Sequence, residues 1–245
     1  MAEIRDDSLF TQPDESYLGE CPICCLPLSL AAKKYTINSC CCKYICDGCC
    51  HANMKREREQ GLEMRCPYCR EPIPKTKEEA INIAMKRVEA NDPIGLCQVG
   101  AWYNEEGDYE TANEYYTKAA ALGDVTAHHN LSVLYRKGLG VEKDLKKELY
   151  HLEEAAIGGH SKARHNLGCY ENDNGRVDRA TRHFVIAANL GHDGSLETVK
   201  KGFMDGLVSK EDFEKALRGH QAAVDATKSK QREEATRRTY RSGGK

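Results

Sequence analysis

The sequence predicts a mostly α-helical protein in which a small metal-binding domain precedes an α-solenoid of stacked helix pairs. Two observations carry this prediction. Of the 13 cysteines in the 245 residues, all except Cys97 and Cys169 lie between Cys21 and Cys69. Beyond this segment, an alanine pair followed by a glycine recurs at intervals of 36 and then 32 residues, a spacing typical of helical repeats. The chain is long enough for one large or two small domains, and the uneven distribution of cysteine favours two.

The cysteines near the N-terminus form three C-x-x-C pairs and one triple. A C-x-x-C turn presents two thiolates on the same side, so two pairs can complete a tetrahedral zinc site without a further ligand. Eight thiolates are enough for two such closed sites, which are structural rather than catalytic. We therefore expect two Zn²⁺ ions, held by Cys21, Cys24, Cys40, Cys41, Cys46, Cys49, Cys66 and Cys69.

The alternative interpretation is a disulfide scaffold, which requires an oxidising compartment. The first twenty residues carry acidic side chains and no apolar stretch, so they do not resemble a signal peptide. No segment approaches the length of a membrane span, and we expect no membrane partner. These features favour zinc and a cytoplasmic or nuclear location. A net charge of −2 offers no basic surface, which disfavours nucleic acid as a partner.

The rest of the chain reads as helix pairs. The alanine pairs begin at Ala119, Ala155 and Ala187, and each is followed at the same offset by a glycine. Paired alanines let neighbouring helices approach closely, and the glycine supplies a left-handed helix end. The helices are expected at about 76–90, 93–106, 108–122, 125–137, 144–157, 161–173, 176–190, 193–205 and 210–225.

These patterns also predict the domain limits. Residues 1–19 are expected to be disordered and 20–72 to form the zinc domain. Thr76-Lys77-Glu78-Glu79 has the form of a capping box, so the solenoid is expected to span 76–225 after a proline-containing linker. Residues 226–245 lose the apolar stripe and are expected to form a polar, basic tail that projects or frays.

The second repeat unit resembles Sel1-like repeats, which belong to the tetratricopeptide type. Their units run A-x-x-x-L-G-x-x-Y-x-x-G-x-G-V-x-x-D and then an alanine pair and a glycine. The first and third units depart from this pattern because they have shorter turns between their helices. The matching positions are Ala127, Leu131, Tyr135, Gly138, Gly140, Val141, Asp144, Ala155, Ala156 and Gly159.

The order and spacing of the cysteine pairs resemble a RING domain, which contains a short β-hairpin and a helix. The resemblance implies that the first and third pairs hold one zinc and the second and fourth pairs hold the other. Lys43 stands where most RING domains have a histidine, and a cysteine fills the vacancy in all-cysteine variants. Cys41 matches the ligand spacing both of ordinary RING domains and of the all-cysteine variants. Cys40 is taken as the other ligand of this pair, and Cys42 is the alternative to Cys40.

A RING followed by Sel1-like repeats resembles a family of proteins abundant in diatoms, over roughly residues 20–235. The RING resemblance implies a ubiquitin ligase that binds a ubiquitin-conjugating enzyme charged with ubiquitin and acts by positioning it. The family's contact positions correspond to Ile23, Pro67 and Arg70. The repeats would then bind a protein client. The alternative is a non-catalytic interaction scaffold, favoured by the missing histidine and by the lack of tryptophan at 52–54.

Overall fold

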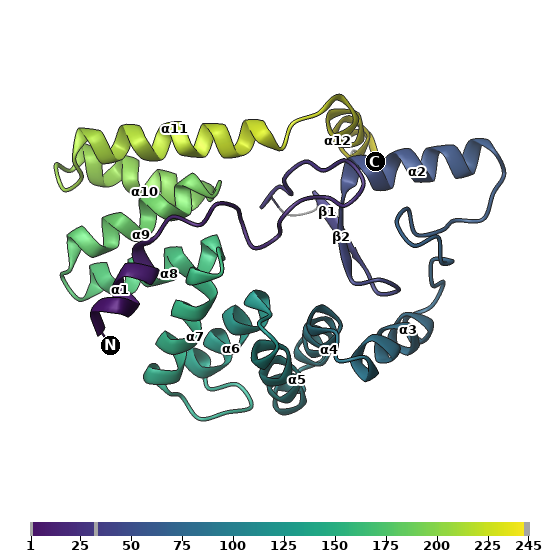
Figure 1. Ribbon diagram of the computed structural model, residues 1–245, viewed down its shortest axis with the longest axis horizontal. Helices are drawn as coiled ribbons and strands as arrows, with labels where there is room; N and C mark the ends of the chain where they lie inside the picture. Colours follow the sequence, from purple (N-terminus) through teal and green to yellow (C-terminus); the bar gives the residue numbers. More distant parts are fainter. Residues whose placement is uncertain (1, 32–33, 243–245) are drawn as a thin grey trace. The chain divides into compact units, whose positions relative to one another are not determined.

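The computed structural model describes residues 2–31 and 34–242. They form two compact units, each assembled from separate stretches of chain (Figure 1). We call Leu18–Val99 together with the residues from Ala226 onward the cysteine unit. The residues up to Tyr17 together with Gly100–Asp225 form the solenoid unit.

The cysteine unit is built around one hairpin and one helix. Strands β1 (Tyr35–Asn38) and β2 (Lys43–Cys46) pair antiparallel. Helix α2 (Asp47–Glu59) follows directly, and the Cys46 side chain caps it by accepting a hydrogen bond from the backbone N–H of Cys49. Further residues of this unit lie in α3 (Lys77–Glu89), in the first part of α4 (Pro93–Glu106) and in α12 (Lys230–Ser242).

The solenoid unit continues from α4 through consecutive antiparallel helices. The limits of helices α4 to α11 lie within two residues of those predicted, which confirms the helix pattern read from the sequence. The contacts between successive helices follow the repeat order, so each pair packs on the next. The helices are α5 (Tyr109–Ala121), α6 (Val125–Lys137), α7 (Leu145–Ile157), α8 (Ser161–Asp173), α9 (Val177–Asn189), α10 (Asp193–Met204) and α11 (Lys210–Ala226).

Small residues hold these helices close together. Ala155, Ala156 and Ala163 are fully buried and form one core cluster with Leu152 and Leu167. A second cluster joins α9, α10 and α11 and contains Ala180, Phe184, Val199 and Ala216, among others. The repeated alanines therefore mark helix contacts, as expected from their spacing.

The long turn of the second repeat unit depends on two glycines in the left-handed region. Gly138 ends α6 with φ 70°, and Gly140 has φ 64°. A Cβ on Gly140 would lie 2.4 Å from the carbonyl carbon of Tyr109 and 2.6 Å from the backbone nitrogen of Glu110. Backbone atoms cannot rotate aside, so the turn approaches the start of α5 more closely than any side chain permits.

Gly140→Ala should therefore destabilise the solenoid unit by more than the cost of its backbone angle. The matched control is Gly175→Ala, because Gly175 also has a positive φ (73°) but nothing lies within 4 Å of its added Cβ. We expect the control to cost about 1–2 kcal/mol and Gly140→Ala roughly twice that in urea denaturation followed by circular dichroism. Equal losses would mean that the turn shifts away from α5 without cost.

The N-terminal segment differs from the predicted disorder. Ala2–Phe10 forms α1, which packs on α7 and α9. Leu9 is buried in the core cluster of α7 and α8, and the fully buried Arg164 donates hydrogen bonds to the carbonyls of Leu9 and Ala156. The Arg179 guanidinium also donates hydrogen bonds to both carboxylate oxygens of Asp6, at 2.7 and 3.1 Å. These tertiary contacts order a segment whose own composition does not predict a packed helix.

The boundary between the units also differs from the predicted one. The sequence placed α3 in the solenoid, whereas it groups with the cysteines. The reason is a close contact at Gly95 near the start of α4, where a Cβ would lie 2.8 Å from the Cβ of Arg87 and 3.4 Å from the Cys42 sulfur. Gln98 also donates a hydrogen bond to the Ser39 hydroxyl, at 3.5 Å. The proline-containing linker is thus internal to the cysteine unit.

The prediction of a polar tail that projects or frays was also wrong. Residues 230–242 form α12, which packs on α2 instead of projecting. Its buried residues, Arg232 and Ala235, give too short an apolar stripe to be recognised in the sequence. The side chains from 238 onward lie outside the described residues.

Among the described residues, the structure contains no helix that is both long and apolar enough to cross a membrane.

Candidate metal centres

The first and last cysteine pairs lie in turns of the same form. In the first, the backbone N–H of Cys25 bonds the carbonyl of Cys21 (2.8 Å), and in the last that of Arg70 bonds the carbonyl of Cys66 (3.0 Å). Cys25 and Arg70 both have a positive φ, 52° and 66°. Short antiparallel bridges, Glu20 with Pro27 and Arg65 with Pro72, close the two turns.

The cysteine triple forms a third turn of this kind between β1 and β2. The backbone N–H of Cys42 bonds the carbonyl of Asn38 at 2.8 Å, and Cys42 has φ 52°. Cys42 thus occupies the place that Cys25 and Arg70 take in the other two turns, one residue after a sulfur that faces the cluster. Its own sulfur packs toward Arg87 and Gly95.

The turns bring the cysteines together as two interleaved clusters. The first cluster contains Cys21, Cys24, Cys46 and Cys49, and the second contains Cys40, Cys41, Cys66 and Cys69. Within each cluster all four sulfur atoms lie within 4.8 Å of one another. These are the eight cysteines selected from the sequence, and Cys42 belongs to neither cluster. Each cluster could hold a metal ion.

The distances between sulfurs suit a tetrahedral ion. Four sulfurs at about 2.3 Å from a zinc ion lie about 3.8 Å apart. Cys24 and Cys46 are separated by 3.8 Å, and Cys41 and Cys66 by 3.9 Å. A disulfide requires about 2.05 Å, and all 13 cysteines are free thiols. The donor set therefore fits zinc.

The thiols within each cluster differ in their pKa values. Burial raises the pKa of Cys41 and that of Cys49 to about 12. The pKa of Cys21 is lowered to about 4, chiefly by hydrogen bonding with Cys46. Burial acts to raise the pKa of Cys69, but hydrogen bonds from the backbone of Glu71 and from Cys40 outweigh it and lower that pKa. A divalent cation at the centre of a cluster would stabilise all four thiolates.

The three residues predicted to contact a conjugating enzyme, Ile23, Pro67 and Arg70, differ in their exposure and in their contacts within the unit. Ile23 is 41% exposed at the tip of the first turn, and Pro67 is half-buried in the last. The Arg70 guanidinium is engaged within the unit, because it bonds Asn53 Oδ1 at 2.9 Å and Glu57 Oε1 at 2.8 Å. Arg70 therefore has a structural role that the sequence did not reveal.

Glu57 is the buried partner in this network, with 0% exposure. Its second carboxylate oxygen accepts hydrogen bonds from the backbone N–H of Arg65 (3.1 Å) and the side chain of Asn53 (2.9 Å). Burial acts to raise the pKa of Glu57, but the bonds from Arg65 and Arg70 outweigh it and hold that pKa below its usual value. This ion pair fastens α2 to the last cysteine turn.

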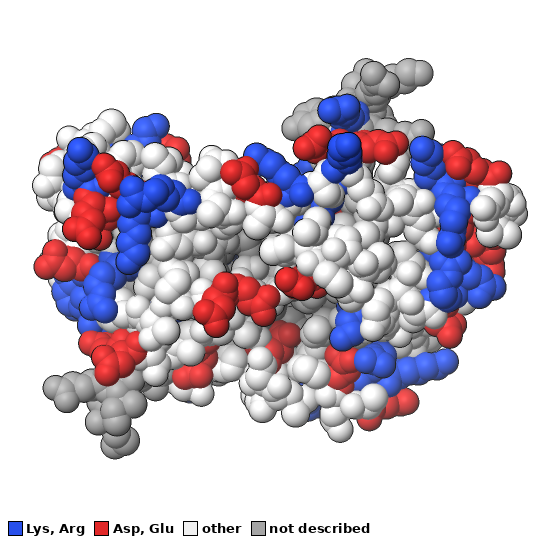
Figure 2. Space-filling view, turned by 45° about the horizontal axis from the view of Figure 1, so that its top comes forward, with Lys and Arg blue, Asp and Glu red and all other residues white. Residues whose placement is uncertain are grey.

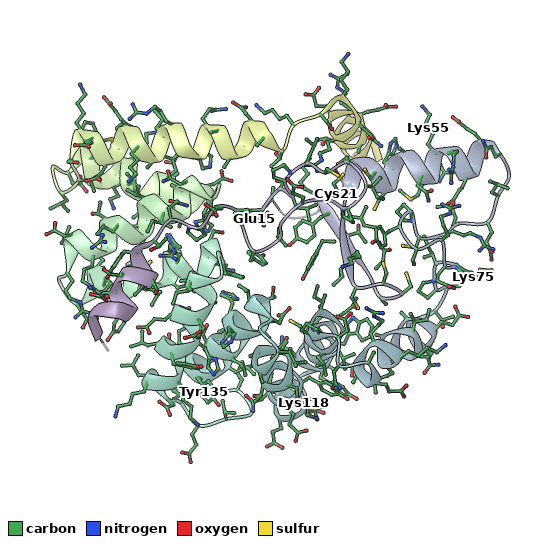
Figure 3. All side chains as sticks on the ribbon, in the orientation of Figure 1. Glu15, Cys21, Lys55, Lys75, Lys118 and Tyr135 are labelled. Atoms are coloured by element: carbon green, nitrogen blue, oxygen red, sulfur yellow. The ribbon has the colours of Figure 1, made fainter. Side chains whose placement is uncertain are left out.

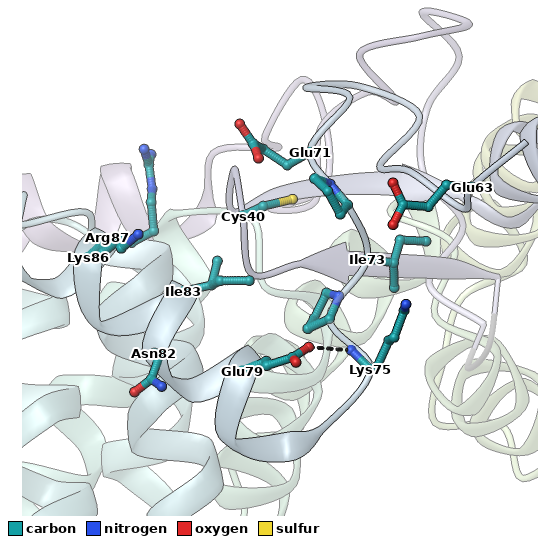
Figure 4. A pocket seen from close by; sticks show the side chains of 12 residues that line it. Cys40, Glu63, Glu71, Ile73, Lys75, Glu79, Asn82, Ile83, Lys86 and Arg87 are labelled. Carbon is teal, nitrogen blue, oxygen red and sulfur yellow. Dashed lines mark hydrogen bonds between the residues drawn. The ribbon is translucent and has the colours of Figure 1, made fainter.

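A pocket of about 750 Å³ borders the second cluster (Figure 4). Cys40 lies in its wall, and the proline-containing linker and α3 line the rest. Three acidic residues, Glu63, Glu71 and Glu79, and three basic ones, Lys75, Lys86 and Arg87, are among its lining residues. Such mixed charge favours no single ligand class.

The charged surface is mixed as well. On the face shown in Figure 2, lysine and arginine side chains are interspersed with aspartate and glutamate and do not gather into one basic field. This distribution agrees with the formal net charge of −2.

The helical part of the chain matches a known family. The profile of the Sel1 repeat matches residues 95–124, 125–160 and 161–192. These residues are Sel1 repeats. The glycines at 138 and 140 that shape the long turn fall in the second of them. Stacked Sel1 repeats form a scaffold for protein–protein interaction.

Known structures and relatives agree with the Sel1 assignment. A Sel1 repeat protein from Oxalobacter formigenes superposes with a TM-score of 0.54 and 23% identity, covering 74% of this chain and 72% of that one, which shows the shared fold. An uncharacterised protein of Neisseria meningitidis is 35% identical over 85 residues, 34% of this chain and 18% of that one. A protein of Arabidopsis thaliana, the ERAD-associated E3 ubiquitin-protein ligase component HRD3B, is 40% identical over 53 residues, 22% of this chain and 9% of that one. The chain spans less than a fifth of these two relatives.

Proposed function

We propose that the protein is a RING-type ubiquitin ligase, or a ligase-like protein, that carries two zinc ions. Its cysteine unit binds a ubiquitin-conjugating enzyme charged with ubiquitin, and its Sel1 repeats bind the protein client. The closed zinc sites perform no bond chemistry, so the activity consists of holding the charged enzyme in a reactive arrangement. A cytoplasmic or nuclear location is part of this proposal.

The observation that carries the proposal is the interleaving of the cysteine pairs. The first pair clusters with the third and the second with the fourth, which is the arrangement that the RING resemblance implies. A chain of independent zinc knuckles would instead cluster neighbouring pairs. The hairpin followed by α2, between the second and third turns, agrees with the same architecture.

The surface of the cysteine unit supports recruitment of a partner. Ile23 stands exposed on the first turn and Pro67 lies on the last, at the positions where the family contacts the conjugating enzyme. For the solenoid unit, the name of the Arabidopsis relative associates one protein of similar sequence with a ubiquitin ligase. That match is short, so it supports the pairing of such repeats with a ligase and nothing finer.

One observation favours the second candidate, a non-catalytic scaffold. In a ligase, the residue at Arg70 would bridge the conjugating enzyme and ubiquitin. Here its guanidinium bonds Asn53 and the buried Glu57. A bridging role would draw Arg70 away from Glu57 and leave that buried carboxylate with the more distant Arg56, 3.7 Å away, as its cationic partner, which is costly.

The test is an autoubiquitination assay with the full chain and a panel of charged conjugating enzymes. Ile23→Ala should reduce transfer about tenfold or more at unchanged zinc content, because it removes an exposed apolar contact surface and no metal ligand. Leu62→Ala is the matched control, since Leu62 is an exposed apolar side chain (52%) of the same unit outside the turns. Arg70→Ala is less informative, because it also removes the hydrogen bond that Arg70 donates to the buried Glu57.

No transfer by the wild-type chain with any conjugating enzyme, combined with capture of a partner through the repeats, would establish the scaffold instead. Equal losses in Ile23→Ala and Leu62→Ala would place the recruiting surface elsewhere on the cysteine unit.

A further inference from the structure

The C-terminal helix makes specific contacts with the cysteine unit. The side chain of Gln231 donates to the carbonyl of Gly48 at 3.2 Å, and Lys34 Nζ donates to the hydroxyl of Thr236 at 2.6 Å. Lys55, labelled on α2 in Figure 3, pairs with Glu234 at 3.6 Å. Between these polar contacts, Arg232 is only 8% exposed and Ala235 only 5%. Helix α12 is therefore packed against α2 along one face.

The approach of α12 to α2 is as close as backbone permits. A Cβ on Gly48, in the first turn of α2, would lie 2.9 Å from Cγ of Arg232, 3.0 Å from its backbone nitrogen and 3.1 Å from its Cα. No side chain fits between them, so glycine at this position is what lets Arg232 reach the first cysteine turn.

The guanidinium of Arg232 is directed at the first cluster. Nη1 donates to the carbonyls of Pro27 (2.6 Å) and Thr227 (2.8 Å). Nη2 donates to the carbonyl of Leu26 (3.1 Å) and to the sulfur of Cys24 (3.4 Å). Leu26 and Pro27 close the turn that carries Cys21 and Cys24. None of these hydrogen-bond partners is a carboxylate. The carboxylate of the half-buried Asp47, at the start of α2, interacts with Arg232 through its charge, together with Lys34, but makes no hydrogen bond to the guanidinium among these.

A metal ion explains this arrangement. A divalent cation bound by four thiolates carries a net charge of −2, and burying such a complex favours a nearby positive charge and N–H donors to sulfur. Without the metal, a buried arginine beside neutral thiols would pay a desolvation cost for weak hydrogen bonds. The charge of the complex and the charge of Arg232 therefore account for each other.

We propose that α12 is an integral part of the first metal centre, in which Arg232 holds the ion by donating to Cys24 and by balancing the charge of the complex. The C-terminal segment of the chain thus controls how long the first cluster retains its metal. The inference rests on zinc binding by the first cluster and does not depend on ligase activity.

The experiment measures zinc release from the full chain to a chromogenic chelator. Arg232→Met keeps most of the side-chain length and packing but removes the charge and donors, whereas Arg232→Lys keeps the charge without the planar fork. Gly48→Ala obstructs docking of α12 without altering any charged group. Arg237→Met is the matched control, because the Arg237 side chain is 81% exposed on the same helix.

We expect Arg232→Met and Gly48→Ala to accelerate one of the two release phases, the one that remains in Cys40→Ser, by roughly 10–100-fold. Arg232→Lys should fall between Met and wild type, and Arg237→Met should match wild type. With cobalt in the first cluster, the thiolate-to-metal absorption of Arg232→Met should move to longer wavelength, because a sulfur that loses a hydrogen bond gives up its electrons more easily.

Release and absorption unchanged in Arg232→Met would overturn the proposal and leave Arg232 a packing residue. A wild-type chain that binds no metal at the first cluster would overturn it together with the two-zinc assignment. Ubiquitin transfer plays no part in these readouts, so a chain without ligase activity that still loses zinc in Arg232→Met would support the inference and reject only the ligase.

Discussion

Cys40→Ser is expected to reduce the zinc content of the purified protein from two ions per chain to one, whereas Cys42→Ser leaves it at two. The sulfur of Cys40 lies 3.3 Å from that of Cys69 in the second cluster, so its removal leaves three thiolates and an open position. The sulfur of Cys42 is turned away from the cluster by the positive φ of its turn. Metal analysis by mass spectrometry measures both variants directly.

The same variants separate the two interpretations of the cysteine triple. Loss of one zinc in Cys42→Ser, with retention in Cys40→Ser, would assign the fourth ligand to Cys42. Because the metal supplies much of the folding free energy of such small domains, roughly 10 kcal/mol per site, Cys40→Ser should also lower the thermal stability of the cysteine unit, while the first cluster keeps its ion. Cys25→Ser is a further control, since Cys25 is exposed and follows its pair in the same kind of turn.

The helices of the solenoid were predictable because their pattern is local. An alanine pair, a following glycine and a capping residue lie within a few positions of each other, and the observed helix limits agree with them. Helices α1 and α12 were not predictable in this way. Each is held by residues more than a hundred positions distant, such as Arg164 for α1, and no local pattern encodes such a contact.

For the candidate site, the ligands were predictable from local sequence, whereas the residues around them were not. Ligand spacing is a local property, and the clusters contain the cysteines that the spacing selected. The environment of the site is not local. Arg70 bonds Glu57 across thirteen positions, and Arg232 reaches Cys24 from the other end of the sequence. A basic residue in a charged tail gives no sign in the sequence that it will be buried beside a cysteine cluster.

Buried histidines should make the stability of the solenoid unit strongly dependent on pH. His183 is fully buried, and neither of its ring nitrogens has a hydrogen-bond partner in the described part of the chain. Burial, and next the charges of Arg164, Arg179 and Arg182, lower the pKa of His183 to about 3, with Asp6 acting weakly in the opposite direction.

His129 behaves in the same way within the repeats. Its ring stacks on that of His160, with centroids 4.3 Å apart, and it is 9% exposed. Burial, followed by the charge of Lys162, lowers the pKa of His129 to about 4. The fold therefore holds both rings neutral at pH values where a histidine in the unfolded chain, with a pKa near 6.5, takes up a proton.

The sign of the effect follows from this difference. Above pH 6.5 both states are neutral and these histidines contribute no pH dependence. Below pH 6.5, His129 and His183 bind protons in the unfolded chain but not in the folded solenoid. The free energy of unfolding therefore falls by about 1.4 kcal/mol per pH unit for each histidine. Between pH 7.5 and pH 5, His129 and His183 together should cost about 4 kcal/mol.

The double variant His129→Leu, His183→Leu should reduce this dependence, because it removes two of the groups that protonate on unfolding. Part of the dependence should remain, since burial also lowers the pKa of His151 and His192 to about 4 and that of His160 well below its usual value. Urea denaturation at pH 7.5 and pH 5, followed by helical circular dichroism, measures the change. The variant keeps every cysteine, so acid release of zinc affects it and the wild type alike. Leu131→Ala is the control, since it removes buried packing (Leu131 is 1% exposed) but no ionisable group, and so should leave the slope in place. An equally steep loss in the double variant would show that other groups, and not these two rings, set the acid limit of the solenoid.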